Sequence, residues 1–399
     1  MQDTIEIMRA LVGFDTTGQR SNRTLIDWAA DLLGKQGVEC HIQQGHEQAK
    51  FNLVATIGPK DVPGIVLAGH TDVAPVWHEG WTTDPFRLVS HDGRLFGRGA
   101  LDAKGWVATC LAAVPYFKSL NLKRPVHLAL TYNGETDMKG MAVLADHLKS
   151  MPAVPAGAVV GCPTLMRVVT SDKGSAIWQV KVKGKEAHSS RRHRGVSAVE
   201  VAARIVAHVC EVQRRQQQEG PRNDAFEFPY NSLHVGCIKG GSAVNIVSGV
   251  AKFPIEIRTL PGVDAGAIIK EIEAYCDTLL PEMRAIDPAC AIDFRRERNV
   301  HALTGESNRE LTQTIGALLE DSRPCHAGFG SEAGVLQDAG IPTVVCGPGE
   351  MKGSHLSDES VAISQLEQCG NFLRRLGQHL ASDAPLLGAP DPAVAAMFR

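Results

Sequence analysis

Short apolar runs alternate with helix-like segments through the first part of the chain, and this alternation limits the folds open to it. FNLVATIG (51–58), GIVLAGH (64–70), VHLALTY (126–132) and AGAVVGCPT (156–164) predict buried strands, whereas 105–120 and 137–150 have the spacing of helices. Strands that alternate with helices are typical of a sheet that helices cover. The pattern therefore predicts an α/β fold.

A different pattern begins after residue 173. Residues 176–184 alternate apolar and polar side chains, as expected of an antiparallel strand with one face in water. Helices at 195–218 and 264–280 and strands at 231–241, 250–262 and 290–297 follow, and then the α/β pattern returns. A chain of 399 residues is too long for one ordinary core. We expect a discontinuous domain, 1–173 with 296–399, and an inserted α+β domain, 174–295.

Composition excludes several classes of partner. A net charge of −3 and a pI near 6.6 give no electrostatic case for nucleic acid or a membrane surface. No apolar run approaches the roughly 20 residues of a membrane span. The ten cysteines form no CxxC pair and the N-terminus lacks the pattern of a signal peptide. We therefore expect a protein of a reducing compartment, the cytoplasm.

Residues suited to a metal site follow several of the predicted strands and turns. His70 ends one strand, and Asp72, two positions on, can point the same way. Asp102 lies in a glycine-rich turn before a helix, Glu135 follows another strand, and His355 lies near the end of the chain. Taken singly, they could be helix caps or surface residues. Together they are the ligand types with which a bridging aspartate holds two metal ions.

Several motifs resemble the M20 metallopeptidase family, most closely its acetylornithine deacetylase branch, and the resemblance extends to about residue 380. The motifs are GHTDV (69–73), GWTTDPF (80–86), GRGALDAKG (97–105), GKEAHSS (184–190), GGSAVNIV (240–247), EIRTLPG (256–262), GSEAGVLQDAGIPTVVCGPG (330–349) and His355. The resemblance implies a zinc-peptidase-like domain, a mixed sheet covered by helices, with an inserted lid and dimerisation domain. The implied activity is hydrolysis of an N-acyl amino acid, with N-acetylornithine, an intermediate of arginine biosynthesis, as first candidate.

The resemblance also implies roles for the metal-site residues. His70 would bind one zinc ion, Asp102 would bridge two, and Glu135 and His355 would bind the second, with Asp72 acting beside His70. Cobalt(II) is the alternative ion.

In the inserted domain, the resemblance gives roles to three further residues. His188 would reach across a homodimer into the neighbouring active site and polarise the scissile carbonyl. Asn245 and Arg258 would hold the substrate, and the arginine suits a carboxylate.

Two positions depart from the family pattern. Gly134 stands where the family has its general-base glutamate, and Cys162 stands where it has a glutamate ligand of the first metal. Losing a general base typically costs about 10²–10⁴ in rate, so restoring a glutamate at 134 is expected to speed hydrolysis if two metals bind. A thiolate binds zinc well, but the shorter cysteine reaches the metal only if its loop moves inward. The sequence therefore leaves open whether one or two metal ions bind per chain.

Three functions remain open from the sequence. The first is an amide hydrolase that is slow or uses another base, and Asp137 is one substitute, although a helix cap is the simpler account of it. The second is a changed, non-hydrolytic reaction at an altered metal site. The third is a catalytically silent homologue that binds a metal or ligand. Because the other implied ligands are all present, we favour the hydrolase.

Overall fold

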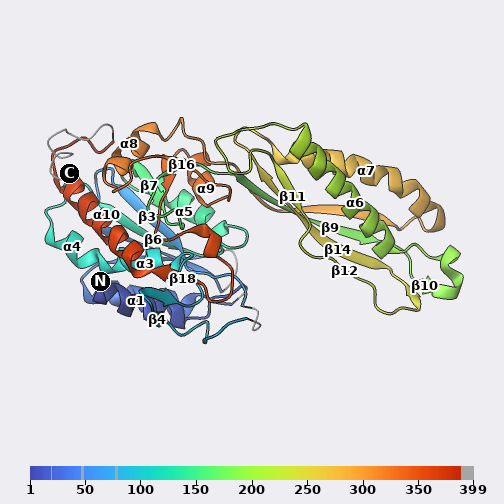
Figure 1. Cartoon of the computed structure of the whole chain (residues 1–399), viewed down its shortest axis with the longest axis horizontal. Coiled ribbons are helices and arrows are strands. Elements are labelled where there is room, and N and C mark those ends of the chain that lie inside the picture. The colour runs from blue at the N-terminus through green and yellow to red at the C-terminus, as the bar shows by residue number, and fades with distance from the viewer. Residues whose placement is uncertain (19, 46–48, 77–79, 388–399) are drawn as a thin grey trace. The chain divides into compact units, whose positions relative to one another are not determined.

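The computed structural model describes the chain except residues 19, 46–48, 77–79 and 388–399. The chain divides into two compact units (Figure 1). Unit 1 comprises Met1–Ser171, Leu303–His326 and Ser331–Arg399, and unit 2 comprises Asp172–Ala302 and Ala327–Gly330. The second boundary falls later than the expected residue 296 because the last strand of unit 2 continues to Val300. The last twelve residues of the expected 296–399 segment, 388–399, lie outside the described residues.

Unit 1 is built on a mixed eight-stranded sheet with the strand order β1-β2-β6-β3-β7-β17-β8-β16. Its strands are β1 (Cys40–Gln44), β2 (Phe51–Ile57), β3 (Ile65–His70), β6 (Val126–Thr131), β7 (Gly157–Val160), β8 (Val169–Ser171), β16 (Cys325–His326) and β17 (Thr343–Val345). A small second sheet contains β4 (Val89–His91), β5 (Arg94–Phe96) and β18 (Ser360–Ala362). The parallel strand β3 lies between β6 and β7 in the middle of the large sheet. The predicted α/β class with a mixed sheet is confirmed.

Helices cover the large sheet of unit 1. They are α1 (Gln2–Gly13), α2 (Arg23–Lys35), α3 (Lys104–Ala112), α4 (Val114–Ser119), α5 (Lys139–Ser150), α8 (Arg309–Ala317), α9 (Ala333–Asp338) and α10 (Ile363–Ala381), with a 3₁₀ turn, η2, at Met351–Gly353. The single helix expected at 105–120 is two helices. Pro115 lies in the first turn of the second one, where its missing N–H costs no hydrogen bond.

The buried strands of unit 1 explain the continuous apolar runs in the sequence. Alternate side chains of β2 and β6, such as Leu53 and Leu128, join one large core cluster with residues of α1, α3 and α10. On the intervening positions, Asn52 donates a hydrogen bond to the carbonyl of Gly140 in α5 at 2.8 Å. Both faces of these strands are thus covered, which removes the polar alternation of a half-exposed sheet.

Unit 2 is an antiparallel sheet with two long helices. Its elements are β9 (Gly174–Lys183), β10 (Ala187–His188), η1 (Ser189–Arg194), α6 (Ala198–Gln218), β11 (Ser232–His234), β12 (Lys239–Gly240), β13 (Ile246–Val247), β14 (Val250–Thr259), α7 (Ala265–Ile286) and β15 (Ala291–Val300). The main sheet has the order β11-β14-β9-β15, and its inward side chains pack with α6 and α7 in one core. The strand expected at 231–241 is two short strands, β11 and β12. No helix among the described residues has the length and apolar character needed to span a membrane.

Candidate metal centre

Four of the expected ligands lie in segments that follow strands and turns of unit 1. His70 is the last residue of β3, and it pairs in parallel register with Thr131, the last residue of β6. Glu135 follows β6, so both chain segments leave the sheet at the same edge, where ligands gather in folds of this kind. Asp102 lies two residues before α3, and His355 follows the turn η2.

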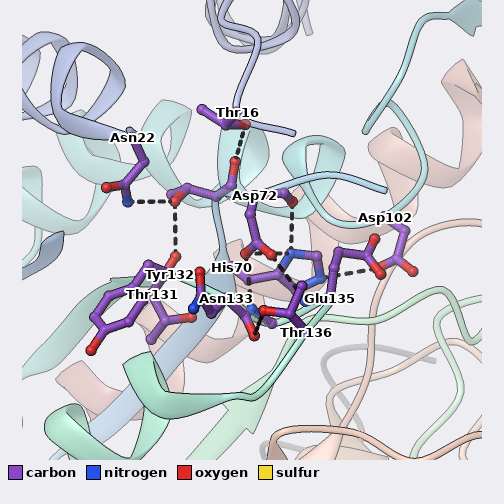
Figure 2. Close-up of polar contacts among 12 residues, drawn as sticks. Thr16, Asn22, His70, Asp72, Asp102, Thr131, Tyr132, Asn133, Glu135 and Thr136 are labelled. Atoms are coloured by element: carbon purple, nitrogen blue, oxygen red, sulfur yellow. Dashed lines mark hydrogen bonds and ion pairs between the residues drawn. The ribbon is translucent and has the colours of Figure 1, made fainter. Parts of the chain in front are cut away.

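The side chains of these residues converge. Ligand atoms of His70, Asp102 and Glu135 all lie within 4.8 Å of one another, and Figure 2 shows the imidazole of His70 beside Asp102. Asp102 Oδ1 is 3.2 Å from His70 Nε2, while its Oδ2 is 3.8 Å from His355 Nε2. Glu135 Oε2 is 2.9 Å from the same nitrogen of His355. The carboxylate of Asp102 therefore faces one imidazole with each oxygen.

Asp72 organises this cluster through the backbone. Its carboxylate oxygens accept hydrogen bonds from the N–H groups of Gly134, at 2.9 Å, and Glu135, at 3.0 Å. Its main-chain carbonyl lies 3.0 Å from Nδ1 of His70, closer than its carboxylate, at 3.6 Å. An Nδ1–H group donating to that carbonyl leaves Nε2 of His70 available as a ligand.

The carboxylates of the cluster favour the protonated forms of its two imidazoles. Burial lowers the pKa of His70, but the hydrogen bond with Asp102 and the nearby carboxylates outweigh burial, so this pKa lies well above its usual value. The hydrogen bond with Glu135 likewise raises the pKa of His355. Burial raises the pKa of Glu135, and its bond with His355 only partly offsets this. The carboxylates thus stabilise positive charge in the cluster, and a divalent cation supplies that charge when it displaces these protons.

The donor set fits a divalent metal such as zinc. Two imidazoles and two carboxylates are borderline and hard ligands, and Asp102 has the placement of a bridging carboxylate. Cys162 is buried in the loop after β7, but it is not part of the group whose ligand atoms converge. The structure thus brings four of the five expected ligands together.

Gly134 has no room for a side chain. A Cβ atom at this position would lie 2.4 Å from Cγ and 2.5 Å from Cβ of His70. Those atoms are at the root of the imidazole side chain, so they cannot move without moving the ligand itself. In this structure the glycine is required by the position of His70.

Asp137, the substitute base considered from the sequence, has local partners. Its Oδ1 accepts hydrogen bonds from the N–H of Lys139, the first residue of α5, at 3.2 Å and from the Asn133 side chain at 3.1 Å. Its other oxygen pairs with the Lys139 ammonium group at 2.6 Å. These contacts are those of a residue that caps and anchors the start of the helix.

The three expected residues of unit 2 lie at opposite ends of its sheet. His188 is exposed, with Nδ1 2.8 Å from the hydroxyl of Ser190, and the carbonyl of Asn245 accepts from the N–H of Ser189 at 2.9 Å. Both belong to the end where Val250 of β14 pairs with Lys183. Arg258 lies eight residues further along β14, roughly 27 Å away for an extended strand. Within one unit 2, His188 and Arg258 cannot contact the same small substrate.

Glu332 is a buried acid that was not singled out from the sequence. It is 3% exposed, and both carboxylate oxygens lie 3.3 Å from the hydroxyl of Thr131, the neighbour of His70 across the sheet. Burial raises the pKa of Glu332 to about 8, and the charge of Asp72 adds to this. Glu332 lies in the motif at 330–349, but an acid before a short helix is read as a cap, so the sequence does not indicate its contact with Thr131.

The raised pKa of Glu332 predicts a specific pH dependence of stability. Between the usual carboxyl pKa and about 8, the unfolded chain loses this proton while the folded chain keeps it, so folding stability falls as pH rises through that window. Glu332→Gln should remove the effect, and the variant should gain melting temperature over the native protein at pH 8.5 but not at pH 5. Thermal melts in chelator measure this, with Glu367→Gln as the same charge change at an exposed site. Equal shifts at both pH values would contradict it.

A mixed α/β sheet with a carboxylate and imidazole cluster at its strand ends is typical of metallohydrolases. The sequence model of peptidase family M20/M25/M40 matches residues 66–379. The acetylornithine deacetylase of Myxococcus xanthus is 32% identical over 398 residues, which cover 95% of this chain and 99% of that protein. That of Pectobacterium carotovorum is 30% identical over 94% of this chain and 97% of its own length. The chain belongs to the M20/M25/M40 peptidase family, whose members are metal-dependent amide hydrolases, and the resemblance seen in the motifs is confirmed.

Solved structures agree on the fold. Human carnosine dipeptidase 1 superposes with a TM-score of 0.73 at 16% identity, covering 95% of this chain and 97% of that one. A dinuclear metal-binding M20 peptidase of Bacillus subtilis gives a TM-score of 0.61 at 14% identity, covering 94% and 97%. The protein is an M20 metallohydrolase similar to acetylornithine deacetylases.

Proposed function

We propose that this protein hydrolyses the amide bond of an N-acyl amino acid, with N-acetylornithine as the first candidate substrate. The observation that carries the proposal is the position of Asp102, which presents one carboxylate oxygen to His70 and the other to His355. A carboxylate with a partner on each side is suited to a two-metal hydrolytic centre. The names of the full-length relatives, acetylornithine deacetylases, suggest the substrate.

In this proposal zinc is the metal and cobalt(II) the alternative. His70 would hold the first ion, Glu135 and His355 would hold the second, and Asp102 would hold both. Cys162 would be a further ligand of the first only if its loop moved inward. When bound, such ions act as Lewis acids toward a carbonyl and make water a nucleophile near neutral pH.

The remaining roles belong to side chains of the chain itself. Asp72 keeps the Gly134–Glu135 turn in place through its two backbone hydrogen bonds. Arg258 binds the substrate carboxylate, Asn245 holds the substrate, and His188 donates a hydrogen bond to the scissile carbonyl as charge develops on its oxygen. A cytoplasmic location fits ten cysteines that form no disulfide among the described residues.

A panel of N-acyl amino acids tests the proposed activity. The zinc-loaded protein should release free amino acid from N-acetylornithine faster than from N-acetyl derivatives of acidic or aromatic amino acids. Faster turnover of another N-acyl amino acid would support amide hydrolysis but exclude N-acetylornithine as the preferred substrate. Saturable binding without release of product from any member would support the silent homologue, the runner-up function, and exclude the hydrolase.

The distance between His188 and Arg258 suggests that a second copy of the chain completes each site. We propose a homodimer formed through unit 2, in which His188 serves the partner's substrate. Co-expressed Asp102→Ala and His188→Ala chains should then form hybrid dimers with one intact site, giving roughly a quarter of native activity although each parent is nearly inactive. Kinetic assays on the purified mixture measure this.

A matched mixture provides the control. Asp102→Ala with His355→Ala damages the metal cluster in both chains, so no intact site forms and no activity should return. If the His188 mixture also shows no recovery while size-exclusion chromatography reveals hybrid dimers, His188 acts within its own chain or has no role in the reaction.

A further inference from the structure

A buried ion pair lies behind the metal cluster of unit 1. Arg98 Nη1 is 2.7 Å from Glu359 Oε2, and each residue is only 2% exposed. Charged side chains are rarely buried so completely, and taking both out of water costs more than a surface pair does. The partners are 261 positions apart in the sequence. The pair therefore joins two segments that are distant in the sequence, and it does so despite the free-energy cost of burying two charges.

Glu359 holds the peptide that carries the proposed bridging ligand. Its second carboxylate oxygen, Oε1, accepts hydrogen bonds from the N–H groups of Leu101, at 2.9 Å, and Asp102, at 3.2 Å. The carbonyl of Glu359 also accepts from the N–H of Gly97 at 2.9 Å. The turn from Gly97 to Asp102 is thus fixed to Glu359 at both of its ends.

Arg98 reaches the segment that carries the opposite ligand. Its Nη2 lies 3.4 Å from the carbonyl of His355 and 3.3 Å from the carbonyl of Pro75, which follows the His70–Asp72 segment. The centroid of the Trp81 ring lies 5.1 Å from the guanidinium carbon of Arg98. One ion pair therefore contacts the backbone of two proposed ligands, Asp102 and His355, and also the carbonyl of Pro75.

We infer that Arg98 and Glu359 are positioning residues that set the separation of Asp102 and His355 and so tune the second metal site. An apolar pair of similar size could fill the same space with equal or better stability. It could not hold N–H groups on one ligand segment and a carbonyl on the other at a fixed spacing. Partners in this outer layer typically change metal affinity by roughly 10–100-fold when removed.

Cobalt(II) binding tests the inference. It relies on the proposed ligands but not on the proposed substrate, because no amide is present in the assay. Glu359→Gln keeps the shape and one acceptor oxygen but loses the charge, and Arg98→Met loses every donor. Both variants should bind the weaker of the two cobalt ions roughly 10–100-fold less tightly, with a changed visible absorption spectrum. Arg98→Lys should recover part of the affinity, since it restores the ion pair.

Arg9→Met is the matched control, because Arg9 pairs with Glu6 at 2.7 Å in the same unit, and both residues belong to α1 rather than to a ligand segment. It should leave both cobalt affinities and the spectrum unchanged. If Glu359→Gln and Arg98→Lys melt at lower temperature but bind both cobalt ions with native affinity and spectrum, the pair is structural only and the inference is wrong. Failure of Arg98→Met to fold leaves the Glu359→Gln and Arg98→Lys measurements to decide.

Discussion

Asp102→Asn should release metal from the protein and lower amide hydrolysis by roughly 10³-fold or more, which corresponds to about 4 kcal/mol of transition-state stabilisation. The native carboxylate faces His70 with one oxygen and His355 with the other. The amide is nearly the same size, but it carries no charge and its NH₂ group cannot bind a cation. The variant therefore removes the shared ligand of both proposed metals while leaving the packing almost unchanged.

Two measurements on zinc-loaded, desalted protein test this expectation. Elemental analysis should find about two zinc ions per native chain and fewer than one in the variant, and kcat/KM should fall in parallel. Asp137→Asn is the matched control, because that aspartate lies near the cluster but contacts Asn133 and Lys139. It should keep native zinc content. Native zinc content and turnover in Asp102→Asn would exclude Asp102 as a metal ligand.

The proposed ligands could be found from the sequence because local patterns mark them. His70 and Glu135 each follow an apolar run that could only be a buried strand, and such strand ends meet at one edge of a sheet. The structure indeed brings these residues and Asp102 within ligand distance of one another.

The surroundings of the ligands could not be found in the same way. Glu332 contacts Thr131, which is 201 positions away in the sequence, and Arg98 contacts Glu359, which is 261 positions away. The motifs that contain Arg98 (97–105) and Glu332 (330–349) mark these segments, but they do not indicate which distant residue each side chain contacts. The extent of unit 2 is also a tertiary property, since Ala327–Gly330 joins it from a segment whose neighbours belong to unit 1.

Gly134 is the position where sequence and structure lead to opposite expectations. The sequence suggests a missing base, so a restored glutamate should speed hydrolysis. The structure places His70 where the first side-chain atom of any replacement would stand, 2.4 Å from the imidazole Cγ. Real Cβ atoms essentially never approach another carbon so closely, so His70 must move. Because His70 ends the central strand β3, it has little freedom to do so.

We therefore expect both Gly134→Ala and Gly134→Glu to weaken metal binding at the His70 side by roughly 10–100-fold and to lower hydrolysis accordingly. Zinc content after desalting should fall from about two ions per chain toward one. The alanine variant isolates the steric effect, since it adds a methyl group and no base. Gly370→Ala is the control, because a Cβ there meets no atom within 4 Å, and it should change neither quantity. If Gly134→Glu instead raises kcat/KM and keeps native zinc content, His70 can shift to make room, and Gly134 marks only the loss of a general base.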